Sequence, residues 1–247
     1  MAEGGADRLV GIARLAAESG RLEAKREVEY FDLPARRYLT RCDSPRVPFR
    51  WTVNPYRGCE FACRYCYARY THEFMELSGG PEFERKIYAK QWSAEAFRRE
   101  LARVPKSESI AIGTATDPYQ PAERRYGVTR KMLEVLATGR GYRIWITTKS
   151  DLVARDAALL AEIGRKNQVW VHLTVTTMET ALARLLEPMA PRPDLRMEAV
   201  RKLRGAGVAV SVITAPVLPL INDSEESLEA VAAAAKGAGA LSWGGNE

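Results

Sequence analysis

The sequence predicts an α/β fold, a partial (β/α)6 barrel of the TIM type, and three observations support this prediction. From residue 48 onward, short runs of β-branched and aromatic residues alternate with helical stretches, and strands joined by crossover helices form parallel sheets. Five or six such units approach a barrel. Apolar residues make up 46% of the 247-residue chain, enough to bury a sizeable core.

Five strands are expected in this region. They are RWTVN (50–54), SIAIGTA (109–115), RIWITTK (143–149), QVWVHLTVT (168–176) and VAVSVIT (208–214). The expected helices cover residues 64–77, 93–103, 128–138, 151–164, 194–205 and 223–239, with a shorter turn at 178–186. A short strand, KIYAK (86–90), is expected outside this repeat. The chain ends at ALSWGGNE, where a sixth strand should begin, so we expect a barrel cut short there with an exposed edge.

Residues 1–47 are interpreted as an N-terminal extension, and residues 48–247 as the core domain. The segment 6–20 can form a short amphipathic helix with Leu9, Ile12, Leu15 and Ala16 on one side. Segment 29–49 contains three prolines and is expected to be an extended connection.

Alternation along the strands predicts two different faces. On strand 168–176 the aliphatic face should pack against helices; it consists of Val169, Val171, Leu173 and Val175. The opposite face should point into the barrel; it consists of Trp170, His172, Thr174 and Thr176, joined by Trp145, Thr147 and Lys149 on the preceding strand. Polar residues near the carboxyl ends of barrel strands usually line a site, and we expect one here.

Charge and hydropathy limit the possible functions less than the strand pattern limits the possible folds. The net charge is +6, from 37 basic and 31 acidic residues, with no concentrated block. This pattern is compatible with a solvated surface or with attraction to an anionic substrate or nucleic acid. No basic start with a following apolar run is present, and the longest apolar stretch is interrupted by Ser, Thr and Pro. We therefore expect a cytoplasmic protein without membrane contact.

Three of the four cysteines lie within eight positions, as Cys59-x3-Cys63-x2-Cys66. In a reducing compartment such spacing indicates a metal rather than a disulfide framework. Zinc modules usually add a second cysteine pair or histidines, and ferredoxin-type carriers a fourth regularly spaced cysteine. The candidates for a fourth ligand here are Cys42 and His72. A structural zinc loop stays open, but three thiolates on a cubane cluster would leave one iron free to bind a substrate or cofactor.

The motif CxxxCxΦC, with an aromatic Tyr65 before Cys66, resembles the signature of radical S-adenosylmethionine (SAM) enzymes. The stretch 48–74, PFRWTVNPYRGCEFACRYCYARYTHEF, is similar to the subgroup related to spore photoproduct lyase. Further segments resemble the same subgroup: GTATDPYQPAE (113–123), TTKS (147–150), LTVTT (173–177), LEPMAPRPDLR (186–196) and APVLPLIND (215–223). The similarity spans about residues 37–243 and implies a partial barrel of the radical SAM type.

This resemblance implies that Cys59, Cys63 and Cys66 ligate a [4Fe-4S] cluster whose remaining iron binds the methionyl amine and carboxylate of SAM. One electron from the reduced cluster would cleave SAM to a 5′-deoxyadenosyl radical, which abstracts hydrogen from an unknown substrate. A flavodoxin or ferredoxin is the implied reductant.

Seven further residues are expected to bind the cofactor: Tyr65, Thr116, Asp117, Lys149, Thr174, Thr176 and Asn222. The resemblance implies that Tyr65 packs near the adenine. Asp117 suits the methionyl ammonium by its charge, and Lys149 suits the carboxylate. Structural roles stay open for several of them: Asp117 can start a turn, and the threonines can simply fill a strand. Asp223 is better explained as the cap of the last helix.

The arginines near the cysteines and the two histidines have other expected roles. The arginines Arg57, Arg64 and Arg69 could offset the charge of a cluster or could lie on the surface. His172 and His72 are expected to be structural rather than catalytic.

One observation limits the resemblance, and two alternative functions stay open. Spore photoproduct lyase uses a further cysteine, downstream of the cluster, as a hydrogen-atom donor, and no cysteine follows Cys66 here. Thymine-dimer repair by that mechanism is therefore not expected. The alternatives are a nucleic-acid-binding protein with a structural metal, and a truncated, inactive relative that still binds a cluster.

Overall fold

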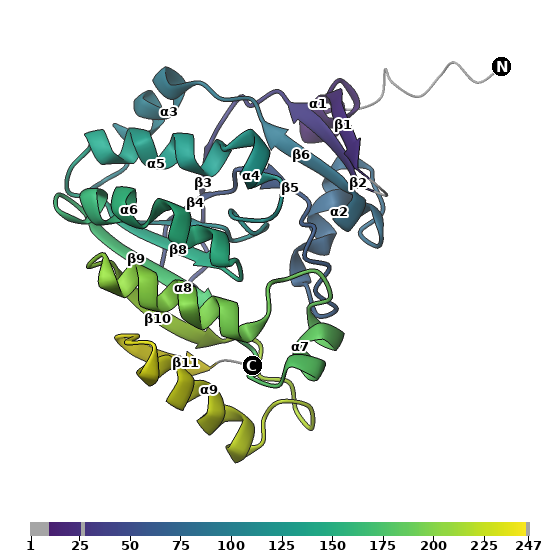
Figure 1. Cartoon of the computed structure of the whole chain (residues 1–247). Helices are drawn as coiled ribbons and strands as arrows, with labels where there is room; N and C mark the ends of the chain where they lie inside the picture. Colours follow the sequence, from purple (N-terminus) through teal and green to yellow (C-terminus); the bar gives the residue numbers. More distant parts are fainter. Residues whose placement is uncertain (1–9, 26–27, 246–247) are drawn as a thin grey trace.

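A seven-stranded sheet forms the centre of the protein (Figure 1), seen in a computed structural model that describes residues 10–25 and 28–245. Its strand order is β11-β10-β9-β8-β7-β4-β3. The strands are β3 (Leu39–Arg41), β4 (Trp51–Val53), β7 (Ser109–Ile112), β8 (Arg143–Thr148), β9 (Gln168–Thr174), β10 (Ala209–Thr214) and β11 (Ser242–Gly245). All neighbours from β4 to β11 are parallel, and only β3 runs antiparallel to β4. The predicted partial α/β barrel is confirmed, and β11 lies where the sixth strand was expected.

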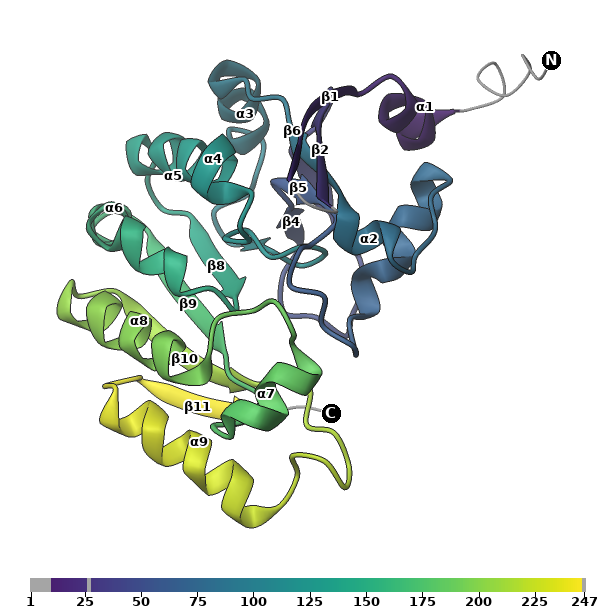
Figure 2. The same cartoon turned by 45° about the vertical axis from the view of Figure 1, so that its right-hand side comes forward.

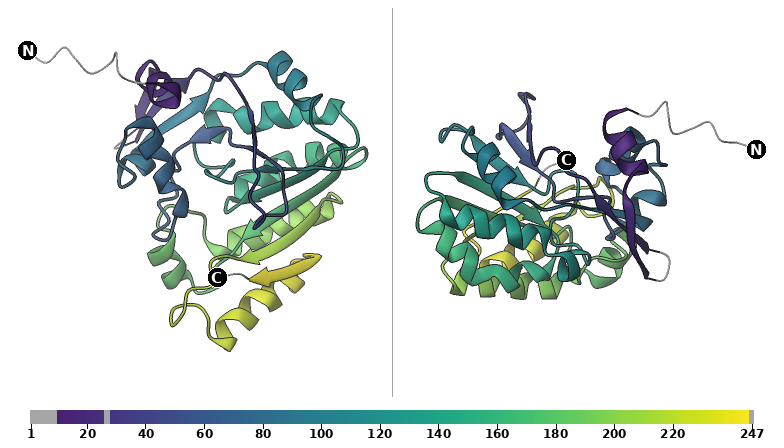
Figure 3. Two further views of the ribbon diagram at one scale, coloured as in Figure 1. Left: turned by 180° about the vertical axis from the view of Figure 1, so that it is seen from behind. Right: turned by 90° about the horizontal axis from the view of Figure 1, so that it is seen from above.

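Helices cover one face of this sheet (Figures 1 and 2). They include α3 (Ala94–Leu101), α5 (Val128–Thr138), α6 (Ala157–Gly164), α8 (Pro193–Gly205) and α9 (Glu225–Gly237). The view from above in Figure 3 shows the helices and strands as separate layers. Val169, Val171 and Leu173 are buried in the core that these helices share, as the alternation predicted. Trp170 and His172, on the opposite face of β9, are partly exposed.

A second sheet packs beside the first, with the order β1-β2-β6-β5. Its strands are β1 (Gly20–Lys25), β2 (Val28–Leu33), β6 (Lys86–Lys90) and β5 (Tyr56–Arg57). The helices α1 (Gly11–Ala17) and η2 (Tyr67–Met75), a 3-10 helix, contribute Ala16 and Met75 to the small core against this sheet. The expected helix near residue 12 and strand 86–90 are therefore present, while Leu9 lies outside the described residues.

The extended connection expected over residues 29–49 was wrong in part. It contains β2, which pairs with β6, and β3, which pairs with β4. The two faces of β2 explain the difference, because Tyr30 is buried in the main core and Leu33, on the opposite face, is buried in the small core. Residues on both sides of position 47 therefore contribute strands to the same seven-stranded sheet.

Local backbone geometry shifted two other boundaries. Gly113 has φ +91°, which ends β7 at Ile112 rather than at residue 115. Cys66 is extended, so the helix expected over 64–77 begins only at Tyr67 and is a 3-10 helix. The cap of α9 was also misassigned: the side chain of Ser224, not that of Asp223, accepts the backbone N–H of Ser227 at 3.2 Å.

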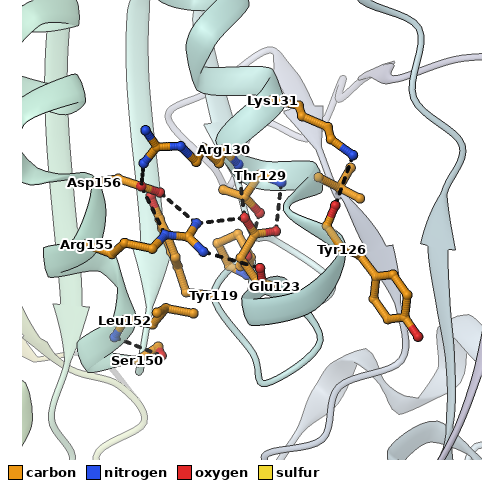
Figure 4. A network of polar contacts seen from close by, with 12 residues as sticks. Tyr119, Glu123, Tyr126, Thr129, Arg130, Lys131, Ser150, Leu152, Arg155 and Asp156 are labelled. Atoms are coloured by element: carbon orange, nitrogen blue, oxygen red, sulfur yellow. Dashed lines mark hydrogen bonds and ion pairs between the residues drawn. The ribbon is translucent and has the colours of Figure 1, made fainter. Parts of the chain in front are cut away.

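Four short elements complete the chain: α2 (Glu82–Arg85), α4 (Glu123–Tyr126), η3 (Asp151–Asp156) and α7 (Thr180–Leu186). A buried polar network joins α4, α5 and η3 (Figure 4). In it Arg155 donates to Glu123 at 2.9 Å and to Asp156 at 3.0 Å, and both carboxylates are fully buried. Within the described part of the chain, no helix is long and apolar enough to span a lipid bilayer.

Candidate functional site

A cavity of about 410 Å³ lies at the carboxyl ends of the parallel strands. The loop after β5 supplies Cys59, Cys63 and Cys66 to its wall, together with Tyr65. The strands and the loops that follow them supply the remaining polar residues of the wall: Thr114, Thr116, Asp117, Thr147, Thr148, Lys149 and Thr174. The structure thus brings together all three predicted metal ligands and five of the seven predicted cofactor-binding residues.

Gly58 allows the cysteine loop, residues 59–66, to approach its neighbours closely. Its φ is +78°, a conformation that favours glycine, and a Cβ there would lie 2.7 Å from the carbonyl oxygen of Lys86 and 2.8 Å from that of Phe83. The following residue, Cys59, donates its backbone N–H to the same Phe83 carbonyl at 2.9 Å. The start of the loop is therefore fixed against β6 and α2.

We expect Gly58→Ala to impair cluster assembly, because a side chain cannot fit between two backbone carbonyls without moving Cys59. Gly164→Ala is the matched control, since its Cβ would meet nothing within 4 Å. Iron bound per chain after reconstitution measures the effect. Equal iron content in the two variants would contradict the role assigned to Gly58.

Thr116 and Gln120 hold the same loop from the other side. The Thr116 hydroxyl donates to the carbonyl oxygen of Gly58 at 2.6 Å, and the Gln120 amide donates to that oxygen at 3.0 Å. The side-chain oxygen of Gln120 also accepts the backbone N–H of Glu60 at 3.0 Å. Thr116 lines the cavity, but its hydroxyl is occupied in fixing the loop.

Asp117 joins the ends of β7 and β8. One carboxylate oxygen accepts the Thr148 hydroxyl at 2.7 Å and the Tyr119 N–H at 2.9 Å, and the other accepts the Lys149 N–H at 2.7 Å. Burial raises the pKa of this carboxyl, although all three hydrogen bonds oppose that shift. The geometry confirms the turn that the sequence left open, and Asp117 also lines the cavity.

Tyr65 reaches from the cysteine loop to a buried ion pair. Its hydroxyl donates to Glu187 Oε1 in a short hydrogen bond, and Thr176 donates to the same oxygen at 3.3 Å. The other oxygen of Glu187 lies 2.5 Å from Nη2 of Arg196. Burial alone would raise the pKa of Glu187. The positive charges of Arg196 and Lys149 outweigh burial, so the pKa of Glu187 lies below its usual value. The carboxylate is therefore ionised and can hold Tyr65 in place.

Lys149 brings a positive charge to the cavity. Its Nζ lies 5.5 Å from the centre of the Tyr65 ring. Burial alone would lower the pKa of its ammonium, but electrostatic interactions with Cys63, in its thiolate form, and with Glu187 raise it instead. Among the described residues, no carboxylate forms an ion pair with Lys149. The ammonium is thus available to an anionic group in the cavity.

Cys59 and Cys63 are buried enough to disfavour free thiolates. Cys59 is 9% exposed and Cys63 is 7% exposed. Burial raises the pKa of the Cys63 thiol to about 12 and that of Cys59 well above its usual range. A bound metal offsets this cost, because coordination replaces the thiol proton. Three soft thiol ligands around one cavity fit an iron–sulfur cluster.

Two predicted cofactor-binding residues, Thr176 and Asn222, do not line the cavity. Thr176 faces Glu187, as described above. The amide of Asn222 donates to the Thr176 carbonyl at 2.8 Å, and its side-chain oxygen accepts the Leu218 N–H at 2.6 Å. In this structure Asn222 braces the loop after β10, and Thr176 supports the carboxylate behind Tyr65.

The two candidates for a fourth ligand lie elsewhere. Cys42 is in the connection between β3 and β4, where its backbone pairs with Arg50. His72 is fully buried in η2, with Nε2 3.1 Å from the Lys86 carbonyl oxygen, and burial lowers its pKa to about 4. Neither residue lines the cavity. His72 is a neutral core histidine.

The arginines near the cysteine loop differ in their contacts. Arg64 donates to the Leu185 carbonyl at 2.7 Å, and Arg69 donates to the Cys63 carbonyl at 2.9 Å. Arg57 has a buried Nε without a hydrogen-bond partner. None of the three lines the cavity, so their contacts indicate support of the loop rather than contact with a cluster.

The sequence interpretation missed Gln120, Glu187 and Arg196. All three lie within segments recognised as similar to a family, but no role was assigned to them. The available signal was charge, since Glu187 and Arg196 are nine positions apart within a proline-rich stretch. That both turn inward depends on the path of the α7–α8 connection, which composition does not reveal.

Comparisons with known proteins identify the family of this chain. The family model described as the radical SAM superfamily matches residues 53–231. An uncharacterized protein of Mycobacterium tuberculosis is 40% identical over 195 residues, covering 78% of this chain and 57% of the relative. An uncharacterized protein of Methanocaldococcus jannaschii is 26% identical, with coverages of 81% and 71%. The chain thus spans just over half the length of the mycobacterial relative.

Solved structures show the same fold. A cysteine-to-alanine variant of spore photoproduct lyase with a dinucleoside spore photoproduct superposes with a TM-score of 0.64 at 19% identity, covering 84% of this chain and 58% of the lyase. A radical SAM methyltransferase from Sphaerobacter thermophilus gives a TM-score of 0.51 at 20% identity, with coverages of 79% and 55%. The family match over residues 53–231, together with the three-cysteine cavity, shows that the chain belongs to the radical SAM superfamily.

Proposed function

We propose that this chain binds a [4Fe-4S] cluster through Cys59, Cys63 and Cys66 and cleaves SAM reductively, giving a 5′-deoxyadenosyl radical that abstracts hydrogen from a substrate. The observation that carries the proposal is the shared cavity, in which the three cysteines and Lys149 face one space. Superfamily membership supports an iron–sulfur cluster and SAM as the cofactors. When bound, they supply the electron and the radical.

The donor set supports a cluster with one iron open to SAM. Cys42 and His72 lie away from the cavity, so the protein offers three ligands there. Three thiol ligands leave one iron of a cubane cluster without a protein ligand, and SAM would bind there.

The remaining residues would bind and orient SAM. The ammonium of Lys149, which is partly buried at the cavity, suits a carboxylate, because a desolvated cation without an anion is costly. Thr174 is buried at the end of β9 and offers a hydroxyl to the cavity. Asp117 presents a carboxylate to a positive group while its own hydrogen bonds hold it still. Tyr65 gives an aromatic surface next to the cysteines.

The reductant is proposed by its chemical class. A one-electron donor such as a flavodoxin or ferredoxin would reduce the cluster, and a reducing compartment such as the cytoplasm would keep the thiols free. The structural neighbour contains a dinucleoside photoproduct. We do not transfer that reaction, because these 247 residues contain no cysteine after Cys66 to donate a hydrogen atom.

Anaerobic reconstitution with iron and sulfide tests the cluster. We expect iron and sulfide in equal amounts, and a change in the electron paramagnetic resonance (EPR) spectrum of the reduced cluster when SAM is added. Stoichiometric zinc in the purified protein, with no iron uptake, would support the structural-metal alternative instead.

A further inference from the structure

Two walls of the cavity are joined through one buried ion pair. Tyr65 belongs to the cysteine loop, and Thr174 ends β9; both line the cavity. Glu187 accepts the Tyr65 hydroxyl, while Arg196 Nη1 donates to the Thr174 carbonyl oxygen at 3.0 Å. The ion pair between Glu187 and Arg196 therefore links the loop to the strand. We call these two residues the Glu187–Arg196 bridge.

Burial makes this bridge rigid. Glu187 and Arg196 are each 1% exposed. The third nitrogen of Arg196, Nε, donates to the Pro191 carbonyl oxygen at 2.8 Å, so all three guanidinium nitrogens have fixed partners. A buried ion pair adds little net stability, because desolvation offsets its attraction, but it demands a defined geometry. Here the ion pair sets the spacing between Tyr65 and Thr174, the two residues that it joins.

The backbone around Glu187 holds the same loop at two further points. Arg64 donates its N–H to the Leu186 carbonyl at 2.9 Å, and Met189 donates its N–H to the Phe61 carbonyl at 3.2 Å. These bonds lie on both sides of Glu187 in the sequence and on both sides of Cys63 in the loop. The α7–α8 connection is thus placed to control where Tyr65 lies.

We propose that the Glu187–Arg196 bridge is a positioning device that sets the separation of Tyr65 and Thr174 and so preorganises the cavity for SAM. Glu187 and Arg196 act through Tyr65 and Thr174, and neither residue lines the cavity. This inference rests on the proposed function, because it assumes that SAM is the molecule bound between these walls. Preorganised walls raise affinity by lowering the ordering cost of binding.

Tyr65→Phe tests the bridge without leaving a buried charge unpaired. We expect the reconstituted variant to hold as much iron as the wild type but to bind SAM about tenfold more weakly, the effect of about 1.4 kcal/mol. The SAM-induced change in the EPR spectrum of the reduced cluster should also differ. Tyr142→Phe is the matched control, because it removes one buried tyrosine hydroxyl that donates to the Leu101 carbonyl, away from the cavity.

Glu187→Gln provides a second, independent test. The glutamine keeps an acceptor for Tyr65 but loses the charge that faces Arg196. Its affinity for SAM should fall as well, and the double variant with Tyr65→Phe should be no weaker than the worse single variant, because both changes break one connection. Fully additive losses would contradict a shared bridge.

The outcomes separate the two proposals. Wild-type affinity and an unchanged spectrum in Tyr65→Phe would overturn the bridge while leaving the proposed function intact. A wild-type chain that assembles a cluster but does not bind SAM would overturn both. Weaker binding in Tyr65→Phe and Glu187→Gln, with full iron content and an unaffected Tyr142→Phe, would support the bridge.

Discussion

Cys63→Ala is expected to abolish cluster assembly, whereas Cys42→Ala is expected to assemble a cluster like the wild type. Cys63 lines the cavity with two other thiols, and its loss leaves only two protein ligands there. Cys42 lies in the β3–β4 connection, outside the cavity. Visible absorption and iron content after anaerobic reconstitution measure the result. Loss of the cluster in Cys42→Ala would contradict the three-ligand assignment.

Glu123→Ala should cause the largest loss of stability of any variant considered. Glu123 is fully buried and accepts four hydrogen bonds. Three come from Thr129 at 2.9 Å, Arg130 at 3.0 Å and Arg155 at 2.9 Å (Figure 4), and the fourth comes from the Tyr56 hydroxyl at 2.5 Å. Breaking such a buried pair leaves an uncompensated charge and costs about 3–5 kcal/mol. For a chain of this size the melting temperature should fall by roughly 10 °C.

Glu95→Gln is the control for that prediction. Glu95 also pairs with an arginine, Arg99, but its side chain is 80% exposed. An exposed pair contributes about 0–1 kcal/mol. Thermal and urea unfolding of the metal-free chains should therefore separate the two variants clearly. Similar stability of both would show that the network at Glu123 does not anchor α4 to η3.

The parallel core was predictable because its strands carry a local pattern. Val169, Val171 and Leu173 alternate with Trp170 and His172, and that alternation is a property of the segment itself. The cysteine spacing was equally local, and it led to the cavity. The position of Lys149 at the cavity could be predicted from the strand pattern, since it lies at the end of a strand on the face that points into the barrel.

The N-terminal strands and the supports of the site were harder to predict. The short strand β3 depends on pairing with β4, and proline-rich flanks conceal it. Thr116 and Asn222 were expected to contact the cofactor because their positions suit it. In the structure their side chains bond Gly58 and the loop after β10, contacts that only the folded chain creates. Whether they also touch SAM stays a prediction.

Glu187 shows why supporting residues escape sequence reasoning. Its partner Tyr65 is 122 positions away in the sequence, and nothing local indicates that they meet. A charged residue normally lies in solvent. Only the path of the α7–α8 connection past the cysteine loop turns Glu187 inward.

Formation of 5′-deoxyadenosine tests the central claim most directly. The reconstituted chain is incubated without oxygen with a strong reductant and SAM, and the products are separated by chromatography. We expect 5′-deoxyadenosine and methionine in equal amounts from the wild type and none from Cys63→Ala. A wild-type chain that carries a full, reducible cluster and yields no 5′-deoxyadenosine would contradict the proposed cleavage of SAM and would support an inactive cluster-binding relative.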